Sequence, residues 1–178
     1  MTTVSVVVRA MRPAEHEAVR DLVRAAFAPY ADVFWPELFA EFLADLLDLD
    51  AGGTSTTLVA VESTAGERVV GTMRLYAAGG ADAVRLPATW AWVLAPAVAP
   101  DRLRHGIATA LFAECERLAV AGGATALCLH ATTFMTAAHR LARRLGFGRV
   151  PAWDFDGGVH FGLPAHDLRI VAYGKEIA

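Results

Sequence analysis

The chain alternates short runs of apolar residues with longer segments in which apolar residues recur every three or four positions. Short apolar runs bounded by polar residues predict strands, and the wider spacing predicts helices. Strands are predicted at residues 4–8, 57–62, 68–76, 91–98, 124–131, 153–155 and 168–173. Helices are predicted at residues 13–27, from Pro36 within residues 30–49, at residues 106–121, and from Thr136, as the cap, to Gly146.

The order of these elements predicts a mixed sheet. The strand, helix and strand over residues 91–131 form a β-α-β unit, which requires a right-handed crossover between two parallel strands. Short connections, such as the turn at residues 64–67, make the other pairs antiparallel. Glycines at 52, 53, 79 and 80, with Asp82, mark loops. At 178 residues, we expect one α/β (α+β) domain over residues 1–178.

Composition narrows the functional classes. The formal net charge of −3 argues against nucleic-acid binding as the main task. Cys115 and Cys128 lie in apolar segments without metal-ligand spacing, so we expect structural thiols and no metal site. No signal segment or membrane span is predicted, which favours a cytoplasmic protein without a membrane partner.

A basic turn follows the strand at residues 91–98, and a glycine then opens an alanine-rich helix. The first amides of a helix have no intrahelical partner, and the helix dipole attracts anions to them. The turn therefore suits a pyrophosphate. The residues predicted to bind it are Arg102, Arg104, His105, Gly106, Ile107, Ala108 and Thr109.

Two motifs within this order resemble the GNAT superfamily of acyl-CoA-dependent N-acyltransferases. Residues 103–108, Leu-Arg-His-Gly-Ile-Ala, match the family turn Arg/Gln-x-x-Gly-x-Gly/Ala, except that Leu103 stands at its first position. Residues 137–147 are similar to a later family helix that ends in Leu-Gly-Phe. The resemblance extends from the first predicted strand to Tyr173.

The resemblance implies a three-layer fold around a mixed, mostly antiparallel sheet. In it, the parallel strands at 91–98 and 124–131 splay apart and hold acetyl-CoA, the co-substrate. The backbone of Ala97 and Val98 would pair with the pantetheine amides, as an added strand does. The implied activity is N-acetyl transfer to a primary amine, a small molecule or a protein amino group, by direct attack in a ternary complex.

The family's general-acid tyrosine is replaced by Ala142, which leaves three alternatives open. The thiolate leaves unaided, since its pKa near ~8.5 permits that; another residue donates the proton; or the chain binds acyl-CoA without turnover. The candidates for the second alternative are Tyr76, Tyr173, His130 and His139. His130 is either a general base or a partly buried histidine bonded to backbone, and His139 is expected at the surface.

Charged and aromatic clusters allow two interpretations each. Glu37, Glu41, Asp45 and Asp48 share one helix face, which either attracts a cationic amine or is simply solvated. Arg140, Arg143, Arg144 and Arg149 either support phosphates or form a solvated surface. Trp90 and Trp92 are expected in the core.

Two other function classes remain as alternatives. One is a non-catalytic acyl-CoA-binding or sensing module, which Ala142 motivates. The other is a Rossmann-like nucleotide binder, which is disfavoured because the turn lacks a second upstream glycine. The predicted partners are acyl-CoA and an amine, and the terminal strands offer an edge for homodimer formation.

Overall fold

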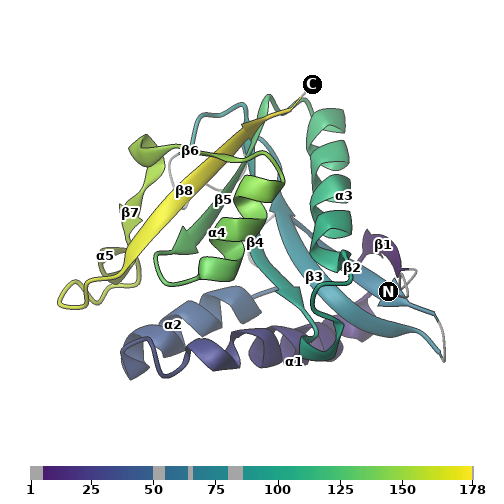
Figure 1. Cartoon of the computed structure of the whole chain (residues 1–178), viewed down its shortest axis with the longest axis horizontal. Helices are drawn as coiled ribbons and strands as arrows, with labels where there is room; N and C mark the ends of the chain where they lie inside the picture. Colours follow the sequence, from purple (N-terminus) through teal and green to yellow (C-terminus); the bar gives the residue numbers. More distant parts are fainter. Residues whose placement is uncertain (1–5, 50–54, 64–65, 80–85, 178) are drawn as a thin grey trace.

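A single mixed sheet organises the protein (Figure 1). The structure, a computed structural model, describes residues 6–49, 55–63, 66–79 and 86–177. Its strands run in the order β1-β2-β3-β4-β5-β8-β6, and β7 pairs with β8. Only the β4–β5 pair is parallel among the described pairs, which confirms the predicted sheet. The strands are β1 (Val6–Ala10), β2 (Ser55–Glu62), β3 (Arg68–Tyr76), β4 (Trp90–Val98), β5 (Ala126–Thr132), β6 (Gly148–Arg149), β7 (Phe155–Asp156) and β8 (Arg169–Glu176).

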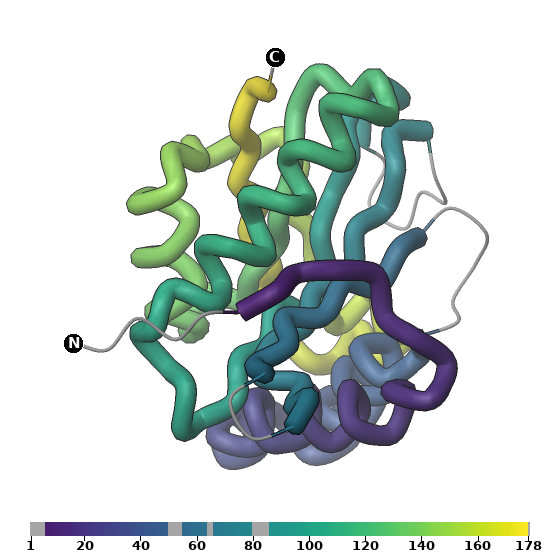
Figure 2. Tube along the Cα trace, turned by 90° about the vertical axis from the view of Figure 1, so that its right-hand side faces the viewer, coloured from purple at the N-terminus to yellow at the C-terminus, as the bar shows by residue number. Residues whose placement is uncertain are grey.

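Helices cover both faces of the sheet. They are α1 (His16–Phe27), α2 (Pro36–Leu47), α3 (Ile107–Ala121), α4 (Thr136–Arg144) and α5 (Gly157–His160). Val19 of α1 packs on Val59 and Val61 of β2, whereas α3 packs on the opposite face. Figure 2 shows α1 and α2 together at the bottom, away from most of α3. No helix in the described ranges is long and apolar enough to cross a membrane.

Close packing fixes where α3 begins. Gly71 of β3 lies directly beneath Ile107, so that a Cβ at Gly71 would come within 2.5 Å of Ile107 Cγ2. Farther along α3, the Cys115 thiol lies 3.5 Å from the Met73 sulfur. The start of α3 is therefore set by contact with β3 rather than by the turn alone. Both cysteines are free and buried, as predicted.

The structure corrects several predicted boundaries. Thr136 is the first residue of α4 and does not cap it, because Met135 holds the cap position and no side chain caps the helix. Trp153 closes a 3-10 turn, Pro151–Trp153, and the predicted strand at 153–155 is reduced to β7. β6 and α5 were not predicted, because elements of two to four residues show no periodicity.

Other predictions concern residues outside the described ranges. These are the start of the first strand, parts of the loops at residues 52–53 and 80–82, and half of the turn at 64–67.

Candidate active site

The parallel strands β4 and β5 separate halfway along their length. They pair from Trp90 with Ala126 to Val93 with Leu129, and no further. Beyond that point β4 stays paired with β3, through Thr72 opposite Ala97. β5 stays paired with β8 to its end. Each strand is thus held by its outer neighbour while the space between them opens.

Two features of β4 explain the separation. Ala95 has a φ of +53°, and the β3–β4 register shifts between Thr72 and Arg74. Positive φ is unusual for alanine and marks a local bulge that turns the strand. Pro96, the next residue, has no backbone N–H to donate to a neighbouring strand.

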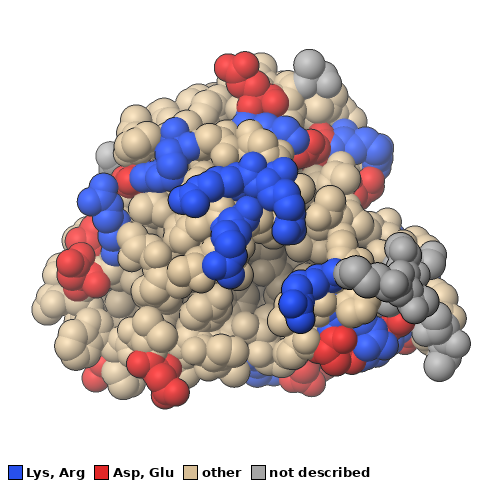
Figure 3. Space-filling model, in the orientation of Figure 1, with Lys and Arg blue, Asp and Glu red and all other residues tan. Residues whose placement is uncertain are grey.

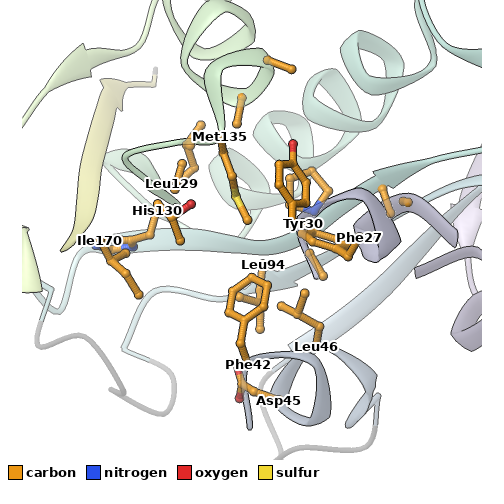
Figure 4. A pocket seen from close by; sticks show the side chains of 18 of the residues that line it. Phe27, Tyr30, Phe42, Asp45, Leu46, Leu94, Leu129, His130, Met135 and Ile170 are labelled. Atoms are coloured by element: carbon orange, nitrogen blue, oxygen red, sulfur yellow. The ribbon is translucent and has the colours of Figure 1, made fainter. Parts of the chain in front are cut away.

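A cavity of about 510 Å³ occupies the opening. Ala108, Ala138 and Leu141 line it from α3 and α4, on one side of the sheet. Tyr76 and His130 line it from the opposite side, and Figure 4 shows His130 among the lining side chains. The cavity therefore extends to both sides of the sheet. Figure 3 shows a hollow in the same view as Figure 1, with basic side chains above it.

The start of α3 forms an anion cradle at one end of this cavity. Gly106 takes the cap position with a φ of +81°, a conformation that favours glycine. The first helical bond runs from Ala110 N–H to the Gly106 carbonyl, at 3.0 Å. The amides of residues 107–109 precede it and have no intrahelical partner. His105 Nδ1 donates to the Leu103 carbonyl at 2.9 Å, which tightens the turn.

The basic residues of the turn differ in their availability. Arg102 Nε bonds Glu62 at 3.1 Å and its Nη1 bonds Asp101 at 2.9 Å, so this guanidinium is already paired. Arg104 is exposed. Ile107 is buried against β3, and so can offer a ligand only its amide. The coenzyme roles predicted for residues 97, 98, 102 and 104–109 stay predictions.

Among the arginines predicted as a cluster, three are exposed on α4, namely Arg140, Arg143 and Arg144. Arg149 instead binds Asp154 through Nη2 at 2.8 Å. The hydrogen bonds of Asp154 to Arg149 and to the Ala172 amide hold its pKa below the ordinary value, although burial acts in the opposite direction. Arg149 thus braces β6 and β8.

His130 lines the cavity. Its Nε2 donates to the Trp153 carbonyl at 3.1 Å, so Nδ1 carries the lone pair of the ring, and the Cys128 sulfur lies 4.0 Å from that nitrogen. Burial lowers the pKa of His130 below its ordinary value. The ring is thus a partly buried histidine bonded to backbone that also lines the cavity, and its role as a general base stays a prediction.

Tyr76 lines the same cavity. Arg74, which is only 2% exposed, donates from Nη1 to Tyr76 Oη at 2.9 Å. Because the bond from Arg74 uses the oxygen only as an acceptor, the tyrosine hydroxyl keeps its own proton, and its role as a proton donor stays a prediction. The ring stacks on Trp92, with centroids 4.0 Å apart, so Trp92 belongs both to the core, as predicted, and to the cavity wall.

Comparison with known proteins decides the family. Residues 16–147 match the model of the acetyltransferase (GNAT) family. The chain belongs to this family. The predicted family, fold and acyltransferase class are thereby confirmed. A search of the curated proteins gave no match.

Solved acetyltransferases share the fold at low sequence identity. PaiA N-acetyltransferase from Thermoplasma acidophilum, in complex with coenzyme A, is 14% identical at a TM-score of 0.68, over 94% of this chain and 98% of that one. A GNAT family acetyltransferase from Brucella melitensis, in complex with acetyl-CoA, is 21% identical at 0.58, over 98% and 92%. The ribosomal-protein-S18-alanine N-acetyltransferase from Escherichia coli is 15% identical at 0.64, over 98% and 95%.

In this acetyltransferase, Ala142 is packed in the core, and the polar side chains near it are hydrogen-bonded to each other. Ala142 is fully buried. One turn earlier, His139 Nδ1 lies 3.0 Å from Tyr173 Oη, and its Nε2 lies 3.0 Å from the Thr132 carbonyl. The expectation of His139 at the surface is wrong, because its ring bonds inward through both nitrogens. His139 and Tyr173 do not line the cavity, whereas Tyr76 does.

Sequence reasoning missed three polar residues that line the cavity, Tyr30, Thr132 and His160. Thr132 is 1% exposed, and its hydroxyl has no hydrogen-bond partner among the described residues. Figure 4 shows the Tyr30 hydroxyl directed away from Phe42. No local motif marks these positions, because the point along β4 and β5 at which the two strands separate decides which side chains face the opening.

The four acidic residues predicted to share a helix face have different surroundings in the structure, and Asp48 is the C-cap that follows α2. Asp45 lines the cavity, whereas Glu37 lies 3.8 Å from His166 Nε2 outside it. Asp45 as a whole is exposed, but partial burial of its carboxyl raises the pKa of that group, and the nearby charge of Arg74 acts in the opposite direction. The solvated-face interpretation therefore fits Glu37 and Glu41, whereas attraction of a cationic amine by Asp45 stays a prediction.

Proposed function

We propose that this protein transfers an acetyl group from acetyl-CoA to a primary amine, by direct attack in a ternary complex. The observation that carries the proposal is the separation of β4 from β5 beyond Val93 and Leu129, with a cavity that extends to both sides of the sheet. One side ends at the anion cradle of α3, and the other at His130 and Tyr76. Such a passage lets a thioester and an amine meet inside the protein.

The chain has groups suited to bind each part of acetyl-CoA. The amides at the start of α3 and the exposed arginines of α4 suit the phosphates. The edge of β4 that faces the opening offers backbone groups near Ala97 and Val98 to the pantetheine amides. Leu103 and Ala108 give the arm an apolar wall.

The chemical step uses groups that face the cavity. The neutral amine nitrogen attacks the thioester carbonyl carbon, so that a C–N bond forms and the C–S bond breaks. His130 Nδ1 takes the proton that the nitrogen loses, and the thiolate takes a proton from Tyr76 or from water. A buried histidine with a lowered pKa, whose Nδ1 is met only by the weakly bonding Cys128 thiol, suits the first role.

The test is thiol release that requires both acetyl-CoA and an amine, with the acetylated amine identified by mass. His130→Gln is expected to lower kcat about 100-fold, with the KM for acetyl-CoA unchanged. In the wild type, kcat/KM falls as the pH drops through the lowered pKa of His130, and the Gln variant lacks this limb. Turnover in the variant equal to that of the wild type would refute the assignment of His130.

A second candidate is an acyl-CoA-binding module without turnover, which the buried Ala142 favours. It predicts that coenzyme A raises the unfolding temperature while no amine or peptide is acetylated. The same samples separate the two candidates.

A further inference from the structure

Seven aromatic side chains line the amine side of the cavity in an unbroken chain of ring contacts, which we call the aromatic collar. They come from α1, α2, β5, β7, α5 and the turns that follow α1 and α5. Successive ring centroids lie 4.8 to 6.1 Å apart. In order, the rings are His130, Phe155, His160, Phe161, Phe42, Phe27 and Tyr30.

The collar leaves few polar groups for an acceptor to bind. Among the described residues that line the cavity, Asp45 alone carries a formal charge at neutral pH, if histidines are neutral. It follows Phe42 by three residues on α2 and stands at the solvent-exposed mouth. Figure 4 shows Asp45 beyond Phe42 and well apart from His130. Asp45 is thus placed to attract a cation at the entrance and not to hold the reacting nitrogen.

We infer that the acceptor is a small primary amine with one positive charge, carried on an aromatic or aliphatic body that the collar encloses. This inference rests on the proposed function. A polyamine or an amino sugar would bring further charges or hydroxyls against the rings, where burial without partners is costly. Ring faces and edges instead suit an apolar body, and they also tolerate a cation in passage.

The first test needs only the wild-type enzyme. Its kcat/KM is measured with ethylamine, butylamine, hexylamine and phenethylamine, and against ethanolamine, 1,6-diaminohexane, spermidine and a short peptide with a free N-terminus. We expect kcat/KM to rise about two- to fourfold for each added methylene. Phenethylamine is expected to exceed ethanolamine at least about 100-fold, since it buries many more apolar atoms.

Matched variants then locate the effect. Phe42→Leu is expected to lower kcat/KM for phenethylamine about tenfold and to lower kcat/KM for ethylamine much less, because ethylamine has fewer apolar atoms to contact the ring. Phe39→Leu, on the same helix but outside the cavity, leaves both unchanged. Asp45→Asn raises the KM for amines about threefold at low salt, and the difference disappears at about 0.5 M salt, because exposed charges are screened. Glu41→Gln is the matched control, since Glu41 is exposed and does not line the cavity.

The outcomes separate this inference from the function beneath it. If coenzyme A binds and none of the amines or peptides is acetylated, the proposed function fails. If ethanolamine, spermidine or the peptide is acetylated as fast as phenethylamine, the function stands and the inference is overturned. A large preference for 1,6-diaminohexane over hexylamine would overturn the requirement for one charge. If Phe42→Leu does not fold, the wild-type series alone decides.

Discussion

Replacing Gly71 of β3 with alanine should disturb the proposed coenzyme site indirectly, because Gly71 packs against Ile107 at the start of α3. The new Cβ would lie 2.5 Å from Ile107 Cγ2 and 3.1 Å from Leu111 Cδ1. Ile107 is 1% exposed, so its side chain has no free space to enter and the start of α3 must shift. Because the amides of that turn form the proposed diphosphate site, the substitution is expected to displace that site without contacting it.

The size of the effect follows from overpacking. Extra methyl groups in a packed core typically cost about 1–3 kcal/mol, and we expect Gly71→Ala to lower the free energy of unfolding within that range. A displaced cradle should weaken coenzyme A binding by about three- to tenfold, equivalent to about 0.7–1.4 kcal/mol. Adding Ile107→Leu removes the branch at Cβ that carries Cγ2, so the double variant should recover part of both losses.

Urea denaturation and calorimetric titration with coenzyme A measure the two quantities. Gly122→Ala is the control, because its Cβ would meet only carbonyl oxygens at 3.4 Å or more at the far end of α3. Wild-type stability and affinity in Gly71→Ala would refute the reasoning. So would a loss of affinity that Ile107→Leu does not relieve at all.

Three more predictions follow from single residues. Gly106→Ala forces alanine to a φ of +81°, so it should lower the free energy of unfolding by about 1 kcal/mol and weaken coenzyme A binding. Gly66→Ala is the control, because Gly66 has a φ of +107° and equally open space around it. It should lower stability but leave coenzyme A binding unchanged in the titration. Thr132→Val removes a buried hydroxyl that has no hydrogen-bond partner among the described residues. It should therefore raise Tm by about 2–4 °C, measured by calorimetry, and should also raise the KM of a substrate. A lower Tm would contradict this prediction. The hydrogen bonds from Arg9 lower the pKa of Glu15 from 4.5 to about 2, so the stability gap between the wild type and Glu15→Gln should be full above about pH 4.5 and close as the pH falls toward 2. A gap in urea midpoints that stays constant from pH 7 to 2 would exclude this pairing.

The central part of the fold could be predicted because its signals are local and strong. The apolar runs of β4 and β5, the glycine at 106 and the periodic segment of α3 define a β-α-β unit without any tertiary information. The motif ending at Gly146 and Phe147 then identified the family. The C-terminal third was less accessible, because β6, β7 and α5 are held by tertiary contacts such as those of Asp154 rather than by periodicity.

The candidate site could be predicted only where backbone geometry is encoded locally. Gly106 is marked by its own conformation, whereas Thr132 and His160 reach the cavity through strand separation and a short helix that no sequence pattern announces. His139 shows the opposite error. Three of the five residues that follow it in the sequence are arginines, which suggests a solvated position. Its hydrogen-bond partners, Tyr173 and the Thr132 carbonyl, instead come from β8 and β5.

A crystal structure of the coenzyme A complex tests the central claim most directly, through the position of the sulfur atom. The account predicts the diphosphate in front of the amides of residues 106–109, and the sulfur between β4 and β5 beyond Val93 and Leu129. Coenzyme A bound elsewhere, with the space between the two strands filled by protein side chains, would contradict it.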